Sequence, residues 1–358
     1  MKSYRFCFYF FLNMLFINAL SAAPTGRRHL LMDYDWKFVQ SDLKNAEKQD
    51  FDDSQWRTLN LPHDWSIEGE FTKDASTKGN GGYLPTGIGW YRKHFDLPTI
   101  SKDQQSWLEF DGVYMNSDVW INGQYLGKHP YGYTSFYYDL TSFIKKGENI
   151  IAVRVDNSLQ PNSRWYSGSG IYRHVWLNIS SSVHIAQWGI YITTPFVDSS
   201  SATISVRTSI ENNYPIARKV VLRSIIKNES GKEITTIETP VSLVPSGKSN
   251  VEQTMKIISP LLWSIETSSL YTLHSSIREE KKEDDNLVST FGIRKIEYNK
   301  DKGFLLNGKH VKMNGVCLHH DAGCLGAAVP EQAWKRRLQL LKEMGCNAIR
   351  TSHNPPAP

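Results

Sequence analysis

The segment VKMNGVCLHHDAGCLGAAVPEQAWKRRLQLLKEMGCNAIRTSHNPPAP, residues 311–358, changes twice between strand and helix patterns. It predicts a strand over Val311–Val316, a helix over Glu331–Met344, where apolar residues recur at helical spacing, and a second strand over Cys346–Arg350. A strand–helix–strand unit is typical of parallel sheets. Because a complete (β/α)8 barrel needs about 250 residues, this segment predicts only the beginning of such a domain.

Polar residues follow both predicted strands. His319–Asp321 come after the first strand, and Arg350–Asn354 end or follow the second. The carboxyl ends of neighbouring barrel strands lie on one face, where active sites are found, so we expect the two groups to converge. Taken singly, each histidine is as readily a hydrogen-bonded loop residue. A metal site is the alternative, but neither group has the usual spacing of metal ligands.

The preceding residues predict two β-sandwiches. From Trp36 to Ile179 the sequence has short alternating strands and tight turns such as Asn122-Gly123, without helices, which favours a sandwich or jelly roll. From Val183 to Phe291 aromatic residues thin out and Ser, Thr, Val and Ile dominate, as in immunoglobulin-like sandwiches. The charged run Glu279–Asp285 is interpreted as a solvated hairpin tip or loop.

Composition indicates a folded protein without a nucleic-acid partner. The hydrophobic fraction of 40% and the charged fraction of 22% are typical of globular domains. The net charge of +5 is too small and too scattered to indicate nucleic-acid binding. The 11 Trp, 17 Tyr and 15 Phe either fill a sandwich core or present flat apolar faces to sugar rings, and the core is the commoner role.

The N-terminus has the form of a secretory signal peptide. It has a basic start, an apolar stretch and small residues at 21–23. The pattern predicts removal of residues 1–23 and export to the periplasm or the extracellular space. A membrane anchor is the alternative, but Asn13 and Asn18 interrupt the apolar run. We expect no membrane span after the signal peptide.

Three cysteines lie near the end of the sequence. Because Cys317, Cys324 and Cys346 are odd in number, they exclude a full disulfide framework in an exported protein. We expect small core residues, and a bridge between Cys317 and Cys324 stays open.

Several motifs resemble glycoside hydrolase family 2. The stretches at 314–330 and 344–358 are similar to the opening of that family's catalytic barrel, and the second contains its Asn–x–Ile–Arg–Thr–Ser–His signature. The other similar stretches are LPHDW (61–65), GIGWYRKHF (87–95), DGVYMNSDVWINGQYLGKHPYGYTSF (111–136), VDNSLQPNSRWYSGSGIYRHVWL (155–177) and FGIRKIEY (291–298). The resemblance implies a jelly-roll sugar-binding domain over 24–181, an immunoglobulin-like β-sandwich over 182–296 and the beginning of a TIM barrel over 297–358.

The same resemblance implies a set of sugar-binding residues. Asp156 matches an aspartate that reaches the barrel mouth and, in several β-galactosidases, helps to bind sodium. His319 and His353 match two histidines of the galactosyl pocket, and Arg350 matches an arginine at its base. The substrate-binding residues expected here are therefore Asp156, Arg164, Trp165, His319, Arg350, His353 and Asn354.

The function implied is hydrolysis of terminal non-reducing β-D-galactosides, with retention of configuration, in carbohydrate catabolism. The segment CLHHDAGCLGAAV favours galactose, because it is most similar to the β-galactosidases of the family. The alternatives are a β-glucuronidase or β-mannosidase of the same family, or a non-catalytic carbohydrate-binding sandwich protein. Family members are commonly dimers or tetramers, so we also expect a homo-oligomer.

The catalytic pair is expected outside these residues. A retaining glycosidase uses two carboxylic acids about 5–5.5 Å apart, which in this family are glutamates on later barrel strands. Glu331 and Glu343 belong to the first barrel helix, on the outer ring, and do not match either one. We therefore expect residues 1–358 to be inactive alone. The family's magnesium ligands are likewise expected beyond Pro358, so magnesium and sodium would be cofactors of a longer enzyme.

Overall fold

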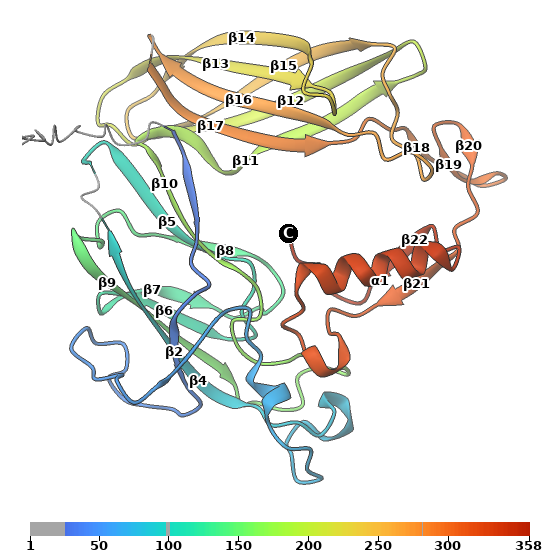
Figure 1. Ribbon diagram of the computed structural model, residues 1–358. Coiled ribbons are helices and arrows are strands. Elements are labelled where there is room, and N and C mark those ends of the chain that lie inside the picture. Colours follow the sequence, from blue (N-terminus) through green and yellow to red (C-terminus); the bar gives the residue numbers. More distant parts are fainter. Residues whose placement is uncertain (1–25, 98–100, 281) are drawn as a thin grey trace, which may run out of the picture.

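The computed structural model describes residues 26–97, 101–280 and 282–358, and Figure 1 shows two β-sandwiches followed by a short α/β segment. The expected signal peptide, residues 1–23, lies outside the described residues. In the part of the chain that the structure describes, no helix is long and apolar enough to cross a membrane.

The first sandwich pairs a four-stranded sheet with a six-stranded sheet. Trp36 and Tyr91 of the larger sheet belong to one buried core with Phe110 and Leu177 of the smaller sheet, as an alternating inward-facing pattern requires. The smaller sheet has the order β1 (Arg28–Leu31), β10 (Val175–Ser181), β5 (Gln104–Phe110), β8 (Phe136–Asp139). The larger has the order β3 (Arg57–Leu59), β2 (Trp36–Val39), β4 (Gly87–Leu97), β9 (Gly147–Asn157), β6 (Ser117–Ile121), β7 (Gln124–His129).

The second sandwich is immunoglobulin-like and follows the first after a single residue, Ser182. Ile204 and Val206 of one sheet share a buried core with Ile226 and Leu273 of the other. The three-stranded sheet has the order β11 (Val183–Val197), β12 (Ser201–Asn212), β15 (Gly247–Ile258). The four-stranded sheet has the order β14 (Glu233–Leu243), β13 (Arg218–Lys227), β16 (Tyr271–Glu279), β17 (Lys282–Phe291).

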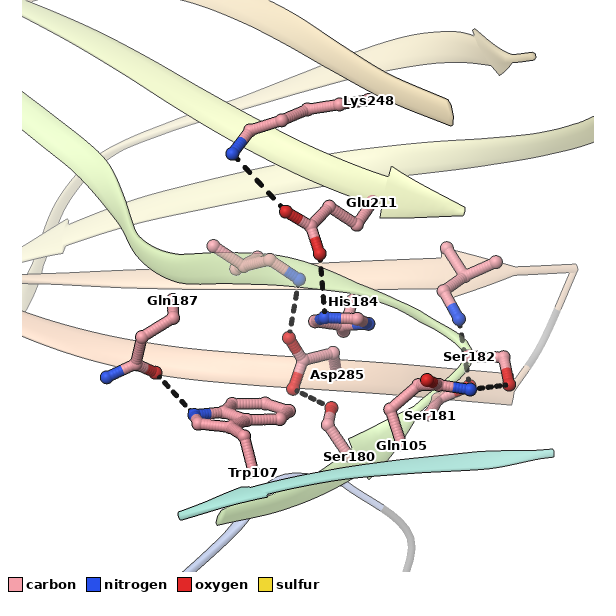
Figure 2. Close-up of polar contacts among 12 residues, drawn as sticks. Gln105, Trp107, Ser180, Ser181, Ser182, His184, Gln187, Glu211, Lys248 and Asp285 are labelled. Carbon is pink, nitrogen blue, oxygen red and sulfur yellow. Dashed lines mark hydrogen bonds and ion pairs between the residues drawn. The ribbon is translucent and has the colours of Figure 1, made fainter. Parts of the chain in front are cut away.

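A buried carboxylate, Asp285 of β17, joins the two sandwiches. Its oxygens accept hydrogen bonds from the Arg27 guanidinium at 2.9 and 3.2 Å and from the Ile185 backbone N–H at 2.7 Å. They also accept from the Ser180 hydroxyl at 2.8 Å (Figure 2). Both side chains of the ion pair are buried, at 6% exposure for Arg27 and 0% for Asp285. The interpretation of 279–285 as a solvated tip is therefore wrong for its end, because Asp285 lies inside a strand with partners from both sandwiches.

A second group of contacts crosses the same junction (Figure 2). The Trp107 indole N–H donates to Gln187 at 2.9 Å, and its ring stacks on His184 with centroids 5.4 Å apart. His184 Nε2 lies 3.5 Å from Glu211, which also pairs with Lys248 at 3.3 Å. The hydrogen bond from His184 is the main reason that the pKa of Glu211 is lowered to about 2.

The α/β segment contains one parallel strand pair around one helix. The hairpin sheet β18 (Ile296–Asn299), β19 (Gly303–Leu306), β20 (Lys309–His310) leads into it. The helix α1 (Glu331–Glu343) confirms the predicted helix, and β21 (Gly315–Leu318) pairs in parallel with β22 (Ala348–Thr351). Among the described residues, three short 3-10 helices lie in loops: η1 (Trp65–Glu68), η2 (Lys78–Gly81) and η3 (Gly323–Leu325).

Both strands of the pair begin later than predicted. The Asn347 side chain accepts from the backbone N–H of Asn314 at 2.8 Å and donates to the carbonyl of Lys312 at 3.0 Å. The Asn314 carbonyl still accepts from the backbone N–H groups of Asn347 and Ala348. The Asn347 side chain, however, takes the place of a backbone partner for the Asn314 N–H and the Lys312 carbonyl, so regular pairing starts only at Gly315.

The three cysteines are free thiols, and the bridge left open between Cys317 and Cys324 is not formed. The expectation that they are core residues is wrong, because Cys317 and Cys324 are exposed and Cys346 is half-buried. One strand pair and one helix do not enclose an interior.

Candidate active site

Three aromatic rings meet where the α/β segment touches the first sandwich. Trp165 lies in the loop after β9, whereas His319 follows β21 and His353 follows β22. The ring centroids of Trp165 and His353 are 4.7 Å apart, those of His319 and His353 are 5.1 Å apart, and those of Trp165 and His319 are 6.1 Å apart. The two strand ends therefore converge, and the jelly-roll loop adds the indole.

The Arg350 guanidinium lies beside this aromatic cluster. It donates to the Ser352 hydroxyl at 3.0 Å and approaches His353 Nδ1 at 3.4 Å. It also contacts the Cys317 thiol at 3.9 Å. Hydrogen bonds from Ser352 and Arg350 lower the pKa of that thiol. The cluster thus has a fixed cation at its edge, in addition to two imidazoles.

His320 points away from its neighbour His319. Its Nε2 lies 3.1 Å from the Ser167 carbonyl, and its ring contacts Tyr133 and Tyr172 edge-on at 5.2 and 5.9 Å. Burial lowers the pKa of His320, which favours its neutral form. This histidine attaches the α/β segment to the first sandwich and is not part of the aromatic cluster of Trp165, His319 and His353.

Asp156 is not brought to the aromatic cluster by any described contact. Its carboxylate accepts from the Ser158 hydroxyl at 2.6 Å and the Ser158 N–H at 3.0 Å, and pairs with Arg154 at 3.3 Å. Burial opposes ionisation, but these bonds outweigh it and lower the pKa of Asp156. Along β9 the buried Val155 and Asn157 flank Asp156, so its side chain lies on the opposite face of the strand.

The surroundings of Asp156 do not suit the expected role of its carboxylate in binding a sodium ion. The guanidinium of Arg154 already neutralises one carboxylate oxygen at 3.3 Å and would repel a cation. Among the described residues no group of three or more His, Cys, Asp or Glu side chains is arranged to hold a metal ion.

The two remaining predicted residues flank the aromatic cluster in different ways. Arg164 precedes Trp165 and is exposed. Asn354 follows His353 and is half-buried, and its buried Nδ2 has no hydrogen-bond partner among the described residues. An amide that lacks a partner in such a position is available to a ligand hydroxyl.

Sequence reasoning missed two polar residues that shape the site. Asn157 donates to the Gly168 carbonyl at 3.1 Å and accepts from Gln160 and Asn162 at 2.9 and 2.7 Å, which holds the loop that carries Trp165. Asp64 accepts four hydrogen bonds within the sandwich and from the α/β segment. Asp64 lies within the LPHDW motif (61–65), but a motif does not show which of its residues bridges two domains.

Comparison with known families agrees with this architecture. The model described as "Glycosyl hydrolases family 2, sugar binding domain" matches residues 32–180, "Glycosyl hydrolases family 2" matches 183–294, and "Glycosyl hydrolases family 2, TIM barrel domain" matches 298–358. The chain belongs to glycoside hydrolase family 2. Its fold is accordingly that family's jelly roll, immunoglobulin-like sandwich and first part of the TIM barrel.

This family 2 chain has several similar relatives. It is 46% identical over 339 residues to the β-galactosidase BoGH2A of Bacteroides ovatus, covering 94% of this chain and 40% of that protein. It is 40% identical to a putative β-glucuronidase of Formosa agariphila, covering 90% of this chain and 30% of that one. A family 2 member from Bacteroides cellulosilyticus superposes with a TM-score of 0.90 at 41% identity, over 92% of this chain and 43% of the other. The chain thus spans less than half the length of these relatives.

Proposed function

We propose that the protein containing this chain hydrolyses terminal non-reducing β-D-galactosides with retention of configuration. The observation that supports a sugar site is the meeting of Trp165, His319 and His353, with Arg350 beside them. An indole offers an apolar face to a pyranose ring, whereas imidazoles and a guanidinium bind hydroxyl groups. The choice of galactose rests on the similarity to BoGH2A of Bacteroides ovatus.

In this proposal the described residues bind and orient the sugar and do not break the bond. Retention needs two carboxylic acids about 5–5.5 Å apart. Glu331 and Glu343 are exposed on α1, so neither suits a role within a pocket. We therefore assign the acid/base and the nucleophile to glutamates outside residues 1–358, and we expect this chain by itself to have no turnover.

A β-glucuronidase is the second candidate. It is favoured by the putative β-glucuronidase of Formosa agariphila, at 40% identity, and by the cations Arg164 and Arg350 near the ring cluster. Either guanidinium is suited to pair with a sugar carboxylate.

We also propose that the protein acts after export, because residues 1–23 have the form of a signal peptide.

The test is a comparison of substrates with the native protein. The p-nitrophenyl β-galactoside, β-glucuronide and β-mannoside are assayed side by side, and proton NMR follows the anomer released first. We expect the galactoside to be cleaved with at least about tenfold higher kcat/KM than the others, with the β-anomer appearing first. Preference for the glucuronide would overturn the galactose assignment, and initial release of the α-anomer would overturn retention.

A further inference from the structure

The Asp64 carboxylate accepts hydrogen bonds from three segments of the chain. Oδ1 accepts from the backbone N–H groups of Ser66 at 3.0 Å and Ser169 at 2.8 Å. Oδ2 accepts from the Tyr166 hydroxyl at 2.5 Å and from the Ala327 backbone N–H at 2.8 Å. Asp64 is only 2% exposed, so water cannot replace these donors. Burial raises its pKa even though the four hydrogen bonds act in the opposite direction.

Two glycines allow the other segments to come this close. A Cβ on Gly168 would lie 2.5 Å from Asp64 Oδ2, and one on Gly326 would lie 2.4 Å from the same oxygen. Both glycines also have positive φ, of 73° and 58°. The backbones on both sides are therefore shaped around this one oxygen atom.

The segments attached to Asp64 are those that carry the site. Ser169 and Tyr166 belong to the loop with Trp165, and Ala327 belongs to the loop that begins at His319. Ala327 is buried in a cluster with tyrosines of the first sandwich, so its position is fixed by packing as well as by its hydrogen bond. A shift at Asp64 would consequently move one ring of the site relative to another.

We propose that Asp64 is a positioning residue for sugar binding, which holds the loop bearing Trp165 against the loop bearing His319. The inference rests on the proposed glycosidase function and deepens it, because it names a group that, together with the contact of His320 to Ser167, sets the distance between the rings contributed by the two domains. Asp64 touches neither ring and is covered by its four donors. It therefore acts through the loops and not on the sugar.

Asp64→Asn in the native protein is the test variant. Asparagine has the same shape, but its NH2 group would face donors that now meet an oxygen. The NH2 group should take the place of Oδ2, where the Tyr166 hydroxyl can accept from it, whereas at Oδ1 it would face two N–H donors. We expect the amide of Ala327 to exchange hydrogen at least about tenfold faster, because it loses its acceptor and protection worth about 1.4 kcal/mol. KM for the glycoside should rise at least about tenfold with a smaller change in kcat, since the sugar contacts exist before the reaction.

Asp33→Asn is the matched control. Asp33 is also buried, at 4% exposure, but its carboxylate bonds to His174 and Val175 within the first sandwich. This variant should leave the exchange of Ala327 unchanged and KM within about twofold. Tyr166→Phe removes one of the four donors and should give a smaller change of the same kind, which keeps the test informative if Asp64→Asn does not fold.

Unchanged exchange in Asp64→Asn, or faster exchange with unaltered KM, would overturn the positioning role. An equal effect of Asp33→Asn would also overturn it, because general loss of stability would then explain the data. If the wild-type protein cleaves no glycoside, the proposed function fails, and the exchange comparison still decides whether Asp64 joins the two loops.

Discussion

The indole of Trp165 and the imidazole of His353 lie with their centroids 4.7 Å apart and their planes inclined by 40°. The indole is held by a hydrogen bond from its N–H to the Tyr133 hydroxyl at 3.1 Å. The imidazole is held by the approach of Arg350 at 3.4 Å. A loop of the first sandwich and the end of β22 therefore form one side of the candidate site together, and neither could form it alone.

Trp165→Ala should weaken sugar binding. Loss of an aromatic face that contacts a ring costs about 0.5–1.5 kcal/mol beyond area burial, so we expect KM for the preferred glycoside to rise about tenfold. Steady-state kinetics measure the effect. Trp188→Ala, at a tryptophan 57% exposed at the junction of the sandwiches, is the control and should leave KM unchanged. Equal effects of the two variants would exclude a specific role for Trp165.

Asp285→Ala should strongly destabilise the junction between the sandwiches. It would leave the Arg27 guanidinium, 6% exposed, without its carboxylate. We expect a loss of about 3–5 kcal/mol in the free energy of unfolding, measured by urea denaturation. Glu331→Ala breaks the exposed pair with Lys335, where both side chains are about 70% exposed, and should cost less than about 0.5 kcal/mol. A loss below about 1 kcal/mol for Asp285→Ala would contradict the role of this ion pair.

Glu211 predicts a pH dependence of stability. Its pKa is lowered from 4.5 to about 2, so its contribution is fully present above the unfolded pKa and is lost as pH falls from about 4.5 to about 2. In urea denaturation the wild type should exceed Glu211→Gln by about 1 kcal/mol near neutral pH, a value reduced by solvent screening. This difference should decrease steadily below about pH 4.5 and vanish only below about pH 2. Ser209→Ala, a neutral change on β12, should give a difference that does not vary with pH.

Gly168→Ala tests the close packing around Asp64. The new Cβ would lie 2.5 Å from Asp64 Oδ2 at a φ of +73°. Gly231→Ala introduces the same strain at a φ of +80° but meets nothing within 4 Å. We expect the control to cost about 1 kcal/mol and Gly168→Ala at least about 2 kcal/mol more, in the free energy of unfolding measured by urea. Equal costs would mean that the loop moves aside freely.

Local patterns predicted the elements of this fold well. The Asn122-Gly123 dipeptide does form the turn between β6 and β7, with φ values of 51° and 80°. The helix α1 followed from its apolar spacing. In these cases the structure is determined by a few neighbouring residues, because turn geometry and hydrophobic periodicity are local properties of the sequence.

Contacts between distant segments could not be predicted in this way. Nothing near Asp285 in the sequence indicates that Arg27 will neutralise it, so a charged run looked solvated. The meeting of His319 and His353 followed from the geometry of parallel strands, whereas the position of Asp156 did not. Its neighbours Val155 and Asn157 are the buried ones, and this alternation places Asp156 on the opposite face of β9.

The hydrogen bond from Ala327 to Asp64 spans 263 residues of sequence, so it also bears on the order of folding. Contacts of such separation form late, since the intervening chain must first give up its freedom. During synthesis from the N-terminus the first sandwich is complete long before Ala327 exists. Until Ala327 has been made, Tyr166 is the only one of the two protein donors to Asp64 Oδ2 that is present. The first domain is thus a template on which the barrel begins to assemble.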